Sequence, residues 1–74
     1  MTPHEATIAI IERVADEHHV GIKDILSGSR MRSTIVARYA AMRAVKQAKP
    51  HLSLPQIGAI FGRDHTIVCR ALGW

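Results

Sequence analysis

Residues 53–72 read SLPQIGAIFGRDHTIVCRAL. Ser53 is suited to the N-cap of a helix, and Gln56 stands three residues later, which is the spacing of a capping box. Pro55 is tolerated in a first helical turn, and apolar residues at helical spacing continue to Phe61. The stretch therefore begins with a short helix whose start is well defined.

A second helix is expected directly after the first. Gly62 can take the conformation that ends a helix, and residues 64–72 resume the helical periodicity with Val68 and Leu72 on the inward face. Two short helices joined by such a turn have the layout of a helix-turn-helix, whose second helix enters the major groove of DNA. A plain helical hairpin has the same layout, so the pattern alone leaves both interpretations open.

Three more helices are predicted upstream, and no segment is a candidate strand. A capping pattern at Thr2 and Glu5 begins the first of them, which should stop near His18. A short helix over residues 22–26 docks on the core, and the longest helix covers residues 32–48, where glycine and proline are absent. The inward stripe expected on this longest helix consists of Ile35, Tyr39, Met42 and either Val45 or Lys46.

The length of the chain indicates one small domain, which the predicted helices make all-α, and its charge is unevenly distributed. The chain has 74 residues and a net charge of +4, and a chain of this size has room for a single core. The charge is uneven, because residues 1–24 hold two basic and five acidic groups whereas residues 25–74 hold eight basic groups and one acidic group. We expect a single domain over residues 1–74 with about five helices, whose basic part favours a polyanionic partner.

Several motifs in one order resemble a known family. Residues 62–66, Gly-Arg-Asp-His-Thr, strongly resemble the G-R-D-H-T-T-V signature of the DNA-binding domain of the bacterial chromosomal replication initiator, DnaA. Residues 53–62 are similar to its S-L-P-x-I-G-x-x-F-G pattern, and residues 28–33 resemble the basic loop before its long helix. The resemblance covers most of residues 20–72. It implies the all-α, TrpR-like fold of DnaA domain IV, with a C-terminal helix-turn-helix at about residues 53–72.

This resemblance implies contacts between basic residues and double-stranded DNA. The loop arginine that matches Arg30 enters the minor groove in the family. The cations that match Arg38 and Lys46 hold phosphates. Arg32 and Arg63 are expected to add positive charge to the same surface.

The helix-turn-helix is expected to supply the remaining contacts. In the family, the positions that match Asp64, His65 and Thr66 read bases in the major groove. The helix start at Leu54 and Pro55 should offer backbone groups and the positive end of its dipole to a phosphate.

Three features differ from the family pattern. One glycine, Gly62, stands where the family usually has two, so the turn is shorter. The second threonine of the signature is Ile67, which can contact a thymine methyl group but cannot bind a phosphate. The chain has no G-x-x-x-x-G-K-[ST] motif, so no nucleotide cofactor is expected. Since a capping pattern follows Met1 closely, we expect a stand-alone chain.

Catalysis, metal binding and a membrane span are not expected. Asp64 and His65 could suggest a catalytic pair, but side chains at i and i+1 on a helix point apart and no nucleophile accompanies them. No apolar run reaches the length of a membrane span, and a single cysteine favours the reducing cytoplasm. A zinc spacing is absent from the candidate ligands His4, His18, His19, His51 and Cys69.

The expected function is sequence-specific binding of double-stranded DNA, without enzyme activity and without a cofactor. The protein would act as a small transcription or replication regulator associated with the nucleoid. The alternative is a protein-interaction module that binds a partner through its acidic first helix or through its end at Trp74. The salt dependence of DNA binding distinguishes the two, because only the first requires the release of counterions.

Overall fold

The computed structural model describes residues 3–28 and 30–73, and within these it has five helices and no strand. The helices are α1 (Pro3–Glu17), α2 (Ile22–Leu26), α3 (Arg32–Ala48), α4 (Leu54–Phe61) and α5 (His65–Leu72). The predicted all-α fold is thereby confirmed, while the N-cap expected at Thr2 lies outside the described residues. None of these helices has the length and apolar character that crossing a membrane requires.

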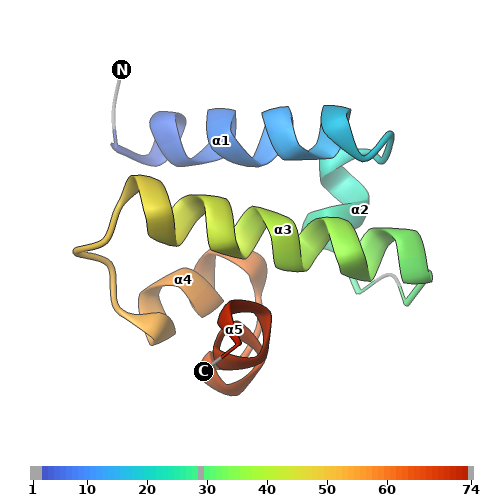
Figure 1. The fold of residues 1–74 in the computed structure, drawn as a ribbon. Helices are drawn as coiled ribbons and strands as arrows, with labels where there is room; N and C mark the ends of the chain where they lie inside the picture. The colour runs from blue at the N-terminus through green and yellow to red at the C-terminus, as the bar shows by residue number, and fades with distance from the viewer. Residues whose placement is uncertain (1–2, 29, 74) are drawn as a thin grey trace.

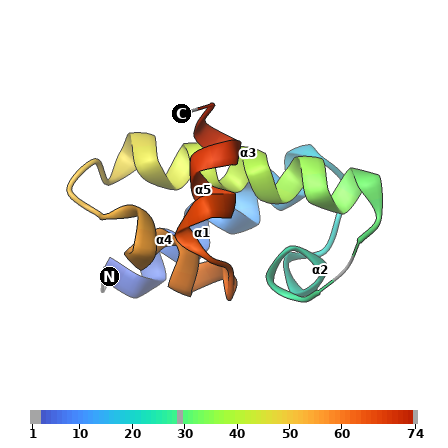
Figure 2. The same ribbon diagram turned by 90° about the horizontal axis from the view of Figure 1, so that it is seen from below.

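The helices form three layers with α3 in the middle. Figure 1 shows α1 beside α3 on one side, running in the opposite direction, and α4 and α5 on the other side. Figure 2 shows α5 crossing α3, with α2 near the end of α3 at which that helix begins. The helix-turn-helix is therefore separated from α1 by the longest helix.

The core lies along α3, and small residues on α3 let its neighbours come close. Ala37 and Ala41 are fully buried, as are Met42 and Val45 further along the same helix. The other helices contribute the remaining buried apolar residues, namely Ile11, Val14, Ala15, Ile25, Ile57, Phe61, Val68 and Ala71.

The predicted inward stripe of α3 is correct in part. Met42 and Val45 are buried, but Ile35 and Tyr39 are half-buried at the rim of the core. The most buried face instead includes alanines and Arg38, which is 4% exposed. Because α1, α2, α4 and α5 all contact α3, its buried face is wider than a single stripe of large apolar residues.

The start of α4 follows the capping chemistry of the sequence, and the start of α5 differs by one residue from the prediction. The predicted box is present at α4: the Gln56 N–H donates to Ser53 Oγ at 3.2 Å, and the Ser53 N–H donates to Gln56 Oε1 at 2.8 Å. The last helix begins at His65, one residue later than expected, because Asp64 is the extended N-cap residue.

Candidate nucleic-acid interface

The turn between α4 and α5 is held tightly against α4. Gly62 has a left-handed φ of 65°, a conformation that glycine adopts without strain. The Arg63 N–H then donates to the backbone oxygen of Gly58 at 2.8 Å. A Cβ on Gly58 would lie 2.5 Å from the Arg63 oxygen, so this position requires glycine. One left-handed glycine is enough to close the turn where the family usually has two.

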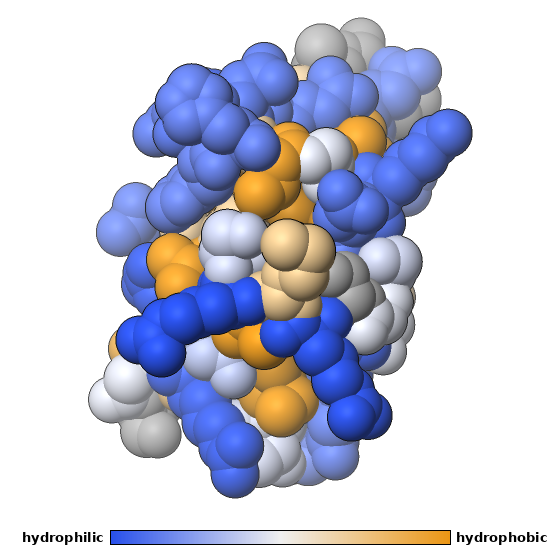
Figure 3. Space-filling model, turned by 90° about the vertical axis from the view of Figure 1, so that its right-hand side faces the viewer, coloured by the Kyte–Doolittle hydropathy of each residue, from blue (hydrophilic) through white to orange (hydrophobic). Residues whose placement is uncertain are grey.

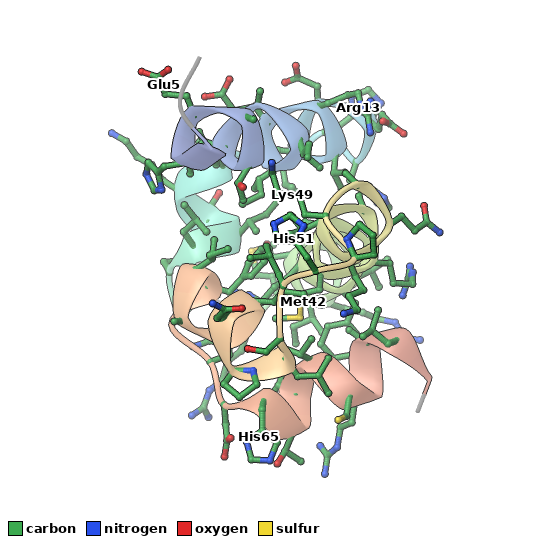
Figure 4. All side chains as sticks on the ribbon, turned by 90° about the vertical axis from the view of Figure 1, so that its left-hand side faces the viewer. Glu5, Arg13, Met42, Lys49, His51 and His65 are labelled. Carbon is green, nitrogen blue, oxygen red and sulfur yellow. The ribbon has the colours of Figure 1, made fainter. Side chains whose placement is uncertain are left out.

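The N-terminal end of α5, with its N-cap residue Asp64, presents the polar residues that the sequence singled out. Asp64, His65 and Thr66 are all exposed, whereas Ile67 is half-buried and Val68 is fully buried. Figure 4 shows His65 at the N-terminal end of α5, projecting away from the body of the molecule. These three residues are therefore free to approach another molecule end-on.

Asp64 and His65 are in direct contact, which the sequence analysis did not expect. The Asp64 Oδ1 and His65 Nδ1 atoms lie 2.8 Å apart, and both side chains are exposed. The expectation that they point apart was wrong because Asp64 lies outside the helix, with an extended backbone and no side-chain cap bond. The pair presents a carboxylate and an imidazole side by side, which offers hydrogen-bond acceptors and donors to a ligand.

The basic loop at residues 28–33 carries its cations on the surface. Arg30 and Arg32 are exposed, and Met31 between them is 68% exposed; Ser29 lies outside the described residues. Figure 3 views the molecule from the end at which α3 begins, and it shows long hydrophilic side chains around exposed apolar atoms. Two predicted DNA contacts are thus accessible in this loop.

Arg38 lies inside the fold. The predicted phosphate contact requires a side chain on the surface. Its Nε donates to the Ile25 oxygen at 2.8 Å, and its second terminal nitrogen donates to the oxygens of Ser27 at 3.0 Å and Asp24 at 3.3 Å. The guanidinium therefore caps the C-terminal end of α2. Burial lowers the pKa of Arg38, and the nearby charge of Arg63 lowers it further.

Lys46 is half-buried beside the loop that leads into α4. Its ammonium donates to the backbone oxygens of Leu52 at 2.8 Å and Pro50 at 3.0 Å. The side chain thus stabilises this loop and also brings a positive charge close to the beginning of α4.

The first turn of α4 has few backbone groups left for a ligand. The capping box uses the N–H groups of Ser53 and Gln56, and the Ile57 N–H donates to the Ser53 oxygen. Pro55 is exposed and has no N–H, while Leu54 is half-buried. The Leu54 N–H is consequently the group of this turn that can bind a phosphate.

Two arginine side chains make tertiary contacts that the sequence did not predict, one from Arg63 and one from Arg43. The Arg63 side chain donates to the backbone oxygen of Ser27 at 2.9 Å, so the turn is joined to the start of the basic loop. Arg43 on α3 donates to the Ala71 oxygen near the end of α5 at 3.1 Å. A glycine inside a helix, such as Gly58, is a sequence signal for a close approach. The two arginine bonds have no local signal, because they join residues far apart in the chain.

The acidic residues of α1 lie on the opposite side of the molecule. In Figure 4, Glu5 and Arg13 mark α1 at one edge, and His65 marks the other edge. Arg13 pairs with Glu17 at 3.7 Å on the exposed surface. The exposed acidic residues of this helix are Glu5, Glu12, Asp16 and Glu17. The acidic side chains of α1 are therefore kept away from the surface formed by α5 and the basic loop, where Asp64 is the exposed acid at the start of α5.

Comparison with known proteins agrees with this arrangement. The family model described as the bacterial dnaA protein helix-turn-helix matches residues 8–73, which include most of α1 and all of α2 to α5. No solved structure matches the chain.

Proposed function

The chain belongs to the family of bacterial DnaA helix-turn-helix domains, and we propose that it binds double-stranded DNA in a sequence-specific manner. In this proposal α5 enters the major groove and the loop of residues 28–33 enters the minor groove. The observation that carries it is the exposed set of Asp64, His65 and Thr66 at the N-terminal end of α5. Recognition helices of this class contact base edges with their N-terminal residues.

The side chains of this first turn suit the chemistry of base edges. The Asp64 carboxylate can accept a hydrogen bond from the amino group of cytosine, and the Thr66 hydroxyl can either donate or accept. His65 offers one ring nitrogen beyond the contact with Asp64. Ile67 is half-buried, and its exposed part can contact a thymine methyl group. We propose that this isoleucine changes the preferred site relative to members with threonine there.

The remaining contacts fix the protein on the DNA backbone and in the minor groove. Narrow A·T-rich minor grooves concentrate negative potential, so Arg30 on its exposed loop favours such a segment. Arg32 and Lys46 supply positive charge for phosphates, and the Leu54 N–H can bind one at the positive end of α4. We assign no phosphate contact to Arg38, because it is buried.

This recognition serves regulation. We propose that the protein acts as a small transcription or replication regulator at sites that resemble those of the initiator, and that it associates with the nucleoid. The 74 residues contain no phosphate-binding G-x-x-x-x-G-K-[ST] motif. We propose that these 74 residues act by binding alone, without ATP hydrolysis.

Selection of binding sites from a random duplex pool tests the proposal. We expect one enriched sequence, with a major-groove segment and an A·T-rich flank beside it. A pool that is retained without enrichment of any sequence would show that binding is non-specific, and a pool that is not retained would reject DNA binding altogether.

A second candidate function is protein binding through α1. One observation favours it: the acidic surface of this helix borders a shallow hollow at the junction with α2. The hollow is lined by Glu12, Ala15, Asp16, Val20, Gly21 and Ile22. Carboxylates beside apolar residues suit a basic side chain of a partner, since its aliphatic stem can pack while its charge is paired.

A further inference from the structure

Two guanidinium groups from distant parts of the chain donate to one backbone oxygen, that of Ser27. Arg38 reaches this oxygen from α3 at 3.0 Å. Arg63 reaches it from the turn before α5 at 2.9 Å, across 36 residues of sequence. Ser27 directly follows α2, at the start of the basic loop. The oxygen is therefore a joint between the basic loop and the helix-turn-helix.

Both sides of this joint are well fixed. Arg38 is buried, and its Nε also donates to the Ile25 oxygen at 2.8 Å, so the end of α2 is tied to α3. The backbone of Arg63 is tied to α4, since its N–H donates to the Gly58 oxygen at 2.8 Å. The absence of a Cβ on this glycine is what permits so close an approach. The Arg63 side chain thus spans the space between two rigid parts of the fold.

We propose that Arg63 is a positioning residue that sets the distance between the two DNA-reading elements. Arg30 lies three residues after Ser27, and Asp64 directly follows Arg63. The bond therefore joins the loop and α5 close to the residues that read each groove. This inference rests on the proposed function, but it assigns Arg63 a role that does not require it to touch DNA.

A fixed distance between two reading elements makes binding sensitive to the spacing of two DNA segments. One added base pair moves the segments apart by about 3.4 Å and rotates them by about one tenth of a helical turn. A rigid protein loses one of its two contacts on such a duplex. A protein whose loop has been released can move the loop to follow the displaced minor groove, and it keeps both contacts.

The test uses duplexes in which one or two base pairs are added or removed between the A·T-rich flank and the major-groove segment. For the unaltered protein we expect about tenfold weaker binding for a change of one base pair, the size of a typical mismatch. For Arg63→Ala we expect the loss to shrink to less than about threefold. Arg38 still holds Ser27 on α3 in this variant, but the basic loop is no longer joined to the turn before α5. Affinity at the original spacing should also fall.

Two matched variants separate positioning from charge. Arg63→Lys keeps the positive charge, but its ammonium ends one covalent bond short of the terminal nitrogen that donates to Ser27. It should therefore flatten the spacing profile while leaving the salt slope unchanged. Arg32→Ala removes an exposed charge at the start of α3 and leaves the Ser27 joint intact. It should lower the slope of log affinity against log salt by about one while keeping the spacing profile. Arg63 is half-buried at the surface, and thermal unfolding checks that each variant is folded.

The outcomes distinguish this inference from the proposed function. A steep profile for the unaltered protein that persists in both Arg63 variants would overturn the positioning role and leave DNA recognition in place. A loss of about one unit of salt slope in Arg63→Ala, restored by Arg63→Lys, would make Arg63 a phosphate contact. An unaltered protein that prefers no duplex would contradict the proposed function itself.

Discussion

The Nε of Arg38 donates to the backbone oxygen of Ile25 over 2.8 Å, so a cation on the longest helix caps the end of the shortest one. A helix of five residues is too short to be stable alone. Its position depends on Ile25, which is fully buried, and on this buried guanidinium. The shape of the basic loop that follows is consequently set by a residue outside the loop.

We expect Arg38→Ala to lower the free energy of unfolding by about 1 to 3 kcal/mol, because it leaves the buried backbone oxygen of Ile25 without its charged donor. Arg38→Lys should recover only part of this loss, since a lysine keeps the positive charge but cannot donate in the same fork. Urea denaturation measures both values. A loss below about 0.5 kcal/mol, the range of ordinary surface substitutions, would show that Arg38 does not hold the fold.

Gly58→Ala should destabilise the helix-turn-helix by about 1 to 3 kcal/mol, the usual cost of forcing extra atoms into a packed site. The added Cβ would meet the Arg63 backbone oxygen at 2.5 Å, and that backbone cannot move without shifting the turn. Gly28→Ala is the matched control, because a Cβ there meets nothing within 4 Å. Equal unfolding midpoints for the two variants would contradict the close approach at Gly58.

The sequence predicted the helices better than it predicted which arginines are buried. Helix ends depend on local chemistry, such as the Ser53 capping box, so they could be placed within a residue. Arg30 and Arg38 are both arginines next to apolar residues, and the sequence does not distinguish the exposed one from the buried one. Burial depends on where α2 packs against α3, a tertiary contact without a local signal. The Asp64 and His65 contact was missed because it depends on which residue is the N-cap.

We expect His65→Ala to cost about 1 to 3 kcal/mol on the selected duplex while sparing binding to unrelated DNA, since it removes a base contact in the major groove. Arg30→Ala should instead abolish the preference for the A·T-rich flank. Affinities on duplexes altered in one half at a time measure both effects. His18→Ala is the control, because His18 is exposed at the end of α1. If the His65 variant weakens binding equally on all sequences, the residue does not read bases.

Glu12→Gln should change DNA affinity by less than about twofold, because the acidic surface of α1 lies opposite α5 and surface charges are screened beyond about 10 Å. The same substitution should weaken a basic protein partner if α1 binds one. Affinity for the selected duplex, measured for this variant and the unaltered protein, tests the orientation of the domain. A large change on DNA would place α1 at the interface and would contradict the proposed docking.

Affinities for the selected duplex and for a base-shuffled duplex, measured between about 50 and 200 mM salt, test the proposed DNA recognition. Over this range the affinity of a protein that contacts phosphates depends strongly on salt. Arg30, Arg32 and Lys46 predict a slope of log affinity against log salt of about −3 on the selected duplex. We expect that duplex to bind at least about a thousandfold more tightly than the shuffled one, the lower end for specific DNA binders. A flat salt response, or equal affinity for the two duplexes, would contradict the account.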